Sequence, residues 1–163
     1  MRYFLTFVTY GSHLHGDEGS GDRSHNLPGS PTLALDEDWV ERDTELMDQE
    51  PFVLDEGDRT VVLKAIREVC AYRKWLLLAA HVRTNHVHVV AESEEKPEKV
   101  MTDFKRYASQ SLNRSDDGEQ NRKHWARHGS TRYLWKDKDV REAVRYVVEE
   151  QREPMAVFRA EGI

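Results

Sequence analysis

The chain has 163 residues, of which 38% are hydrophobic and 33% are charged, values that fit one soluble domain able to bury a core. Its longest uncharged apolar run, Trp75 to Ala80, is too short to span a bilayer, and the first residues lack a signal-peptide pattern. We therefore expect a cytoplasmic protein with no membrane partner. The single cysteine, Cys70, excludes an intrachain disulfide and a thiolate zinc cage, and its apolar neighbours indicate that it is buried.

The negative charge of the chain is concentrated near its start. The net charge is −6, but residues 1–57 hold 13 acidic and 3 basic residues, whereas residues 58–163 hold 17 acidic and 21 basic residues. Residues 99–145 alone hold 12 basic and 7 acidic residues. Because salt screens exposed charges beyond about 8 Å, a local basic strip can bind phosphate on an acidic chain. The charge therefore does not exclude nucleic-acid binding, although such strips are often plain solvated surface.

The first third of the chain predicts one strand and a long insertion. A strand is expected over residues 3–9, which are rich in β-branched and aromatic residues. Residues 11–57 begin with a stretch dense in Gly, Ser, Asp and Pro, which indicates an acidic insertion within a single domain that spans residues 1–163. A short acidic helix is expected over residues 36–49, and Phe52 to Leu54 are expected to anchor the segment to the core.

The remainder of the chain reads as alternating helices and strands. Asp58 is expected to cap a helix whose apolar residues, up to Val69, recur with the helical period. The later predicted elements are strands over 75–82, 86–92 and 131–135 and helices over 97–113 and 137–151. Residues 83–85 form a short turn, so the strands on either side of it should be antiparallel neighbours. The order predicts an α+β fold, a ferredoxin-like split βαβ sandwich with an antiparallel sheet and an extra C-terminal helix.

Two histidines on the strand over 86–92 are the sharpest chemical feature. His86 and His88 project from one face of the strand, because alternate residues share a face, while Val87 points to the opposite layer. Two adjacent imidazoles on a rigid strand supply much of a metal site. A chain with eight histidines also shows such pairs by chance, so the surrounding sequence must decide. His13 and His15 form a second pair, but they lie in a glycine-rich loop where the spacing does not give a shared direction.

The sequence around this pair, RTNHVHVV from Arg83 to Val90, resembles the P-N-H-V-H signature of the single-tyrosine HUH transposases. That family includes transposases of small bacterial insertion sequences and the REP-associated tyrosine transposases. Three further features resemble the family in order and spacing: an opening strand YFLTFVTYG, a basic helix with FKRY, and YLW leading into a helix that carries Tyr146. The resemblance covers residues 1–10 and 58–155, and Arg83 is a modest departure, since many relatives have a Met-Pro pair nearby.

The resemblance implies that Tyr146 attacks DNA to form a 5′-phosphotyrosine, and that His86, His88 and a third side chain hold a divalent ion, Mg²⁺ or Mn²⁺. A phenol is a weak nucleophile at neutral pH, so it needs such a cation. In relatives, Gln or Asn follows the tyrosine by four residues, a position that Glu150 occupies here on the same helix face. Gln151 has the family's preferred chemistry but is rotated by about 140° in a regular helix. The third ligand stays open between Glu150 and Gln151.

The implied substrate is single-stranded DNA with hairpin ends, and the implied assembly is a homodimer that often shares its tyrosine helix between subunits. The side chains expected to contact DNA are Arg83, Asn85, Lys105, Arg106, Arg132, Lys136 and Lys138, although each is also an ordinary surface residue. Tyr107 and Tyr133 are rival nucleophiles, for which we favour base stacking and a structural role, respectively. Two other functions fit the same residues, namely a metal-dependent hydrolase that uses water and a domesticated hairpin-DNA-binding protein.

Overall fold

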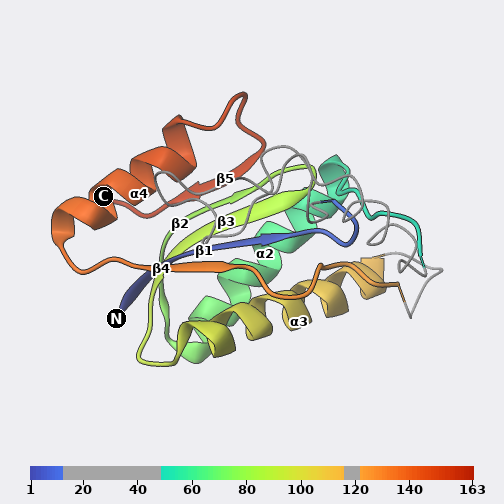
Figure 1. Cartoon of the computed structure of the whole chain (residues 1–163), viewed down its shortest axis with the longest axis horizontal. Helices are drawn as coiled ribbons and strands as arrows, with labels where there is room; N and C mark the ends of the chain where they lie inside the picture. The colour runs from blue at the N-terminus through green and yellow to red at the C-terminus, as the bar shows by residue number, and fades with distance from the viewer. Residues whose placement is uncertain (13–48, 116–121) are drawn as a thin grey trace, which may run out of the picture.

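The computed structural model describes residues 1–12, 49–115 and 122–163, which form an antiparallel sheet with helices on both faces (Figure 1). The elements in chain order are β1 (Arg2–Val8), α2 (Glu56–Arg73), β2 (Leu76–Val82), β3 (His86–Glu92), α3 (Pro97–Ser115), β4 (Ser130–Tyr133), α4 (Asp137–Glu149) and β5 (Ala156–Arg159). The strand order is β4-β1-β3-β2-β5. The first four strands have the predicted ferredoxin-like arrangement, and α4 is the predicted C-terminal helix, so the fold class is confirmed.

The strand β5 was not predicted from the sequence. It pairs antiparallel with β2, from Ala79↔Arg159 to Val82↔Ala156, and extends the sheet by one edge strand. The four residues follow Pro154 closely and carry no alternation long enough to identify a strand. Their extended conformation is stabilised by the edge of β2, which offers backbone partners that the local sequence does not reveal.

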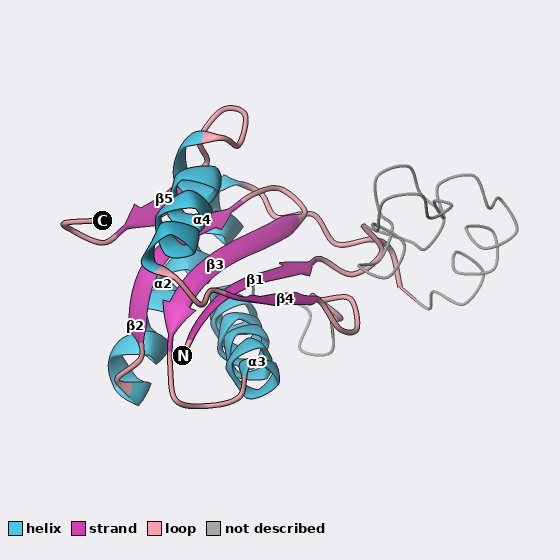
Figure 2. Ribbon diagram, turned by 60° about the vertical axis from the view of Figure 1, so that its left-hand side comes forward, coloured by secondary structure: helices cyan, strands magenta, loops and turns pink. Residues whose placement is uncertain are grey.

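Strand alternation divides the core into two layers. Tyr3, Leu5 and Phe7 of β1 are almost completely buried in the cluster that includes residues of α2 and α3. On the other face, Val90 of β3 and Ala79 of β2 are buried in a cluster with α4. Figure 2 shows α4 crossing in front of the sheet, with α2 and α3 behind it. Side chains on the α4 face are therefore separated by the sheet from those on the α2 and α3 face.

The N-cap of α2 lies three residues before the predicted one. Asp55 is the N-cap residue, with its Oδ1 accepting from the Asp58 N–H at 2.7 Å, and the Asp55 N–H donates to Asp58 Oδ2 at 3.1 Å. This reciprocal pair is a capping box, in which Asp58 is the third helical residue and not the cap. Both residues can cap a helix, which explains the error. The helix ends at Arg73, and its C-cap residue is Lys74, whose φ of 62° is left-handed.

The described ends of the insertion are anchored as expected. The Phe52 N–H donates to the Tyr10 carbonyl at 2.9 Å, the Leu54 N–H donates to the Thr84 carbonyl at 2.8 Å, and Leu54 is fully buried. The predicted acidic helix and the pair His13 and His15 lie outside the described residues.

The structure also bears on the expected burial of Cys70 and on membrane-spanning segments. Cys70 is buried, as predicted, and burial raises the pKa of its thiol to about 12, which makes it unreactive. Within the described part of the chain, no helix combines the length and the apolar character needed to cross a bilayer.

Candidate active site

The two histidines of β3 lie on the face of the sheet that α4 covers. In the register of β1 and β3, His86 is opposite Val8 and His88 is opposite Thr6. The two imidazole rings are in contact, with centroids 4.8 Å apart and ring planes at 72°. Val87 between them is fully buried in the opposite layer. The alternation expected from the sequence is therefore present, and it directs both imidazoles to one side.

Each imidazole is held through its Nδ1 atom. His86 Nδ1 donates to Asn85 Oδ1 at 2.8 Å, because an amide oxygen only accepts, so the lone pair of this ring is on Nε2. His88 Nδ1 lies 2.8 Å from Thr6 Oγ1. Burial, the neighbouring His86, and more weakly His81 and Arg83, lower the pKa of His88 to about 3. His88 is therefore neutral in ordinary buffers, which is the form of imidazole that binds metals.

Tyr146 of α4 lies beside this pair in the same chain. Its ring centroid is 5.8 Å from that of His88 and 5.9 Å from that of Phe4, and the residue is 44% exposed. The apolar stripe that seats α4 on β2 and β3 consists of Val140, Ala143, Val144 and Val147, at the i, i+3, i+4, i+7 spacing. Tyr146 lies on the helix surface next to this stripe, so the packing of α4 on the sheet directs the phenol towards the histidines.

Another histidine, the fully buried His81 of β2, holds the end of α4. The Met155 N–H donates to His81 Nε2 at 2.9 Å, so the ring proton is on Nδ1, which donates to the Val147 carbonyl at 3.0 Å. Carbonyls near the end of a helix need partners from elsewhere, and His81 supplies one. We did not single out this residue in the sequence. A polar side chain inside the apolar run WLLLAAHV was the available signal, because a buried imidazole requires hydrogen-bond partners.

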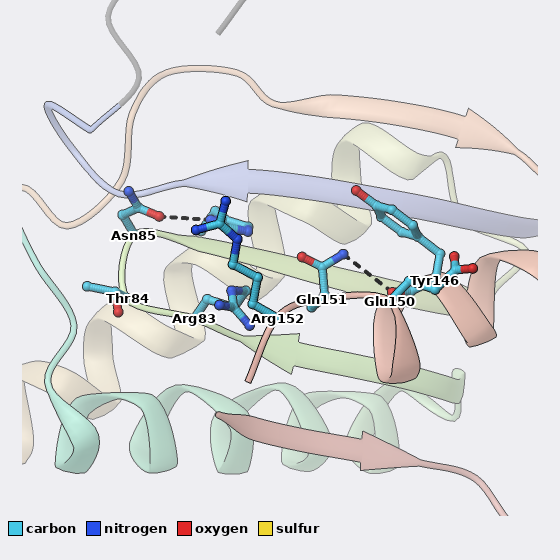
Figure 3. A pocket seen from close by; sticks show the side chains of 8 residues that line it. Arg83, Thr84, Asn85, Tyr146, Glu150, Gln151 and Arg152 are labelled. Atoms are coloured by element: carbon cyan, nitrogen blue, oxygen red, sulfur yellow. Dashed lines mark hydrogen bonds between the residues drawn. The ribbon is translucent and has the colours of Figure 1, made fainter. Parts of the chain in front are cut away.

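His86 and Tyr146 border an open pocket of about 450 Å³ (Figure 3). Its walls come from the turn between β2 and β3 and from the end of α4, and the lining residues are Arg83, Thr84, Asn85, His86, Tyr146, Glu150, Gln151 and Arg152. The Arg83 guanidinium also donates to the Glu153 carbonyl at 3.0 Å, which joins the two walls. Arg152 adds a second guanidinium that the sequence argument did not include. The pocket thus has two cationic side chains and the phenol among its lining residues, with Gln151 between them in Figure 3.

The two candidate third ligands differ in direction. The helix α4 ends at Glu149, and Glu150 has the non-helical angles φ −103° and ψ 0°, so the rotation calculated for a regular helix does not apply to Gln151. The Glu150 carboxylate lies 4.0 Å from Arg145 Nε. The Gln151 amide donates to the Tyr146 carbonyl at 3.3 Å and points into the space between Tyr146 and Asn85 (Figure 3). Across residues 1–12, 49–115 and 122–163, no group of three or more His, Cys, Asp or Glu is arranged to hold a metal.

The residues expected to contact DNA are divided between the two faces. Arg83 and Asn85 line the pocket described above, and Arg132 lines a second pocket that also includes Tyr146. Lys136 and Lys138, near the start of α4, line neither of these two pockets.

The helix α3 places Lys105 and Arg106 across the sheet from the histidines. Lys105 Nζ donates to the carbonyls of Ala126 at 3.0 Å and His128 at 2.6 Å, and Arg106 pairs with Asp103 at 3.2 Å. Both cations thus have partners within the protein.

The rival nucleophiles also lie on the α2 and α3 side. The Tyr133 ring packs edge-on against buried Tyr3 at 5.5 Å and stacks on Trp135 at 5.2 Å. Tyr107 packs against the core cluster of α2 and α3. Neither phenol shares the face of His86 and His88.

Comparisons with known proteins agree with this arrangement. Residues 47–151 match the family described as Transposase IS200 like. Among solved structures, the chain is similar to a REP-associated tyrosine transposase bound to a REP hairpin, with 14% identity, a TM-score of 0.51 and 91% of this chain covered. The chain spans 65% of the length of that protein, and the likeness at this identity concerns the fold. No curated protein matches the sequence. Because the family match covers well over half of the chain, this protein belongs to the IS200-like transposase family.

Proposed function

We propose that this protein nicks single-stranded DNA and transfers the strand through a 5′-phosphotyrosine on Tyr146, in a metal-dependent reaction of DNA transposition. The observation that carries the proposal is the position of the Tyr146 ring, 5.8 Å from His88 on the same face of one chain. A phenol, a pair of imidazoles in ring contact and two arginines at one open pocket match the needs of phosphoryl transfer, which are a nucleophile, a metal site and cations for phosphate.

The donor set fits a divalent ion, Mg²⁺ or Mn²⁺. His86 carries its lone pair on Nε2, and His88 is held at Nδ1 by Thr6, so the chain would offer both rings through the opposite nitrogen. We assign the third protein ligand to the Gln151 amide oxygen, because the Glu150 carboxylate is directed towards Arg145. When bound, the ion would polarise the scissile phosphate and stabilise the charge that develops on it.

In the proposed cleavage step, one ester bond at phosphorus replaces another. The Tyr146 oxygen forms a bond to phosphorus, the bond from phosphorus to the 3′ oxygen breaks, the phenol loses its proton to solvent, and the leaving 3′ oxygen gains one. Each phosphodiester lost is replaced by another, so the reaction needs no external energy source. Attack by the 3′ hydroxyl of a second strand on the phosphotyrosine reverses the step and completes transfer. Arg83 and Arg152 are placed to hold the neighbouring phosphates.

The substrate we propose is single-stranded DNA with hairpin ends. Two observations support this proposal: the similar solved structure is bound to a REP hairpin, and the pocket beside Tyr146 is open. The expected homodimer stays a prediction. The position of the phenol beside the histidines of its own chain supports an active site that one subunit completes alone.

The direct test is to incubate the protein with labelled hairpin-ended single-stranded DNA and Mn²⁺ and to search for a complex that survives denaturant. The wild-type protein should form this adduct, and Tyr146→Phe should form none, because it lacks the nucleophilic oxygen. Tyr133→Phe is the matched control, a tyrosine of similar exposure on the other face, and it should keep the adduct. Cleavage by Tyr146→Phe without an adduct would identify a hydrolase, and hairpin binding without any cleavage would identify a binding protein.

A further inference from the structure

A second pocket, of about 360 Å³, lies on the other side of Tyr146 from the arginine-lined pocket. It is lined by Phe4, Ser130, Arg132, Glu142, Ala143 and Tyr146. The helix α4 packs mainly on β2 and β3, so the same face of β1 and β4 is left open beside it. Its volume falls within the range of small-ligand sites, about 300–1,000 Å³. Because Tyr146 borders both pockets, a strand attacked by this phenol would place one neighbouring nucleotide here.

The walls of this pocket combine aromatic rings with two opposite charges. The rings of Phe4 and Tyr146, 5.9 Å apart at 56°, offer the aromatic surface on which a nucleobase stacks. In the part of the chain that the structure describes, no hydrogen bond or ion pair is recorded for the Arg132 side chain. Glu142 has one distant partner, Lys138 at 3.9 Å on the exposed side of α4. Both charged groups are therefore available to a ligand in the pocket.

We infer that this pocket binds the base next to the scissile phosphate and selects guanine. The inference deepens the function proposed above and rests on it. Guanine presents two adjacent donors, N1–H and the 2-amino group, which a carboxylate such as that of Glu142 accepts together. Its O6 and N7 are the acceptors that an arginine contacts as a pair, and Arg132 supplies that donor. Adenine, cytosine and thymine each set a ring nitrogen acceptor or a carbonyl oxygen against the carboxylate, which repels it.

The first test sequences the DNA that the protein itself selects. A single-stranded library with random sequence is incubated with the protein and Mn²⁺, adducts are isolated in denaturant, and both cleavage fragments are sequenced. We expect guanine to be enriched at one position adjacent to the cleaved phosphate. Glu142→Gln should reduce this enrichment on the order of tenfold while adducts still form, because one bidentate base contact is lost. Glu68→Gln is the matched control, since Glu68 pairs with Lys64 at the same i,i+4 spacing on α2, across the sheet.

The outcomes separate the two claims. Adducts without a guanine preference beside the cleavage site, or with a preference that Glu142→Gln retains, would overturn the assignment of this pocket and leave the strand-transfer proposal intact. No adduct with the wild-type protein would overturn both.

A second measurement needs no cleavage. Tyr146→Phe is titrated with a labelled thymidine tract that carries one guanine, or one inosine, which lacks the 2-amino donor. We expect binding on the order of tenfold weaker for inosine, and equal binding once Glu142→Gln is added. Equal binding in Tyr146→Phe alone would refute the inference.

Discussion

Replacing His81 with leucine should loosen the end of α4 and slow the reaction of Tyr146, although His81 does not reach the pocket. The substitution leaves the buried Val147 carbonyl and the partly buried Met155 N–H without their partner, to which they are now bonded at 3.0 and 2.9 Å. An unpaired buried polar group costs about 1–3 kcal/mol, and water can reach the partly buried Met155 N–H, so the loss in unfolding free energy should be about 1–3 kcal/mol, mainly from the Val147 carbonyl. A small domain has about 5–15 kcal/mol in total, so the variant should stay folded at low temperature.

The assay must distinguish local loosening from a general loss of stability. Denaturant unfolding gives the free energy, hydrogen exchange of a peptide over residues 144–158 reports the end of α4, and adduct formation reports Tyr146. The control is His124→Leu, because His124 is also buried but bonds Ser109 and packs on Phe52, away from α4. Both variants should lose stability, but only His81→Leu should speed exchange over 144–158 and slow the adduct. Equal exchange and equal adduct rates in the two variants would refute the assigned role.

Three further predictions follow from individual contacts. Because the folded pKa of His88 is lowered to about 3, the unfolded chain takes up its proton first as pH falls, so stability present above pH about 6.5 is lost towards acid. Between pH 7 and 5 the free energy of unfolding of the metal-free protein should fall by about 2 kcal/mol through this group, measured by urea unfolding in the presence of a chelator. His88→Asn should remove this part of the pH dependence, and an unchanged pH dependence in the variant would contradict the assignment. Gln151→Leu should weaken Mn²⁺ binding by about tenfold or more in calorimetry, with little effect of Glu150→Leu, and the reverse order would reassign the ligand. Lys105→Met should cost about 1–3 kcal/mol of stability yet leave the salt dependence of DNA binding unchanged, since its ammonium bonds the Ala126 carbonyl; a reduced salt slope would contradict this.

The features that the sequence predicted well are those determined locally. Alternation along a strand directs His86 and His88 to one face whatever surrounds them, and the short turn at 83–85 makes β2 and β3 neighbours. Tyr146 was expected beside the histidines from the family resemblance, and the structure gives the physical reason, since α4 has one apolar stripe to bury and Tyr146 lies next to it.

The features that escaped prediction depend on contacts between distant segments. The strand β5 is extended because it pairs with β2. The choice between Glu150 and Gln151 as the proposed third metal ligand depends on where α4 ends, which His81 and Arg83 influence from other elements. Lys105 reads as a DNA contact on a basic helix, and only the packing of the loop with Ala126 shows that its charge is used internally.

The hydrogen bond between the Phe52 N–H and the Tyr10 carbonyl has an evolutionary consequence. It holds the residues just before and just after the segment 13–48 close together, so the chain leaves the sheet and returns to it at neighbouring points. A segment whose two ends are neighbours can be shortened, lengthened or replaced without shifting any strand. Changes in the length of the acidic segment 13–48 therefore need not alter the face that carries His86, His88 and Tyr146.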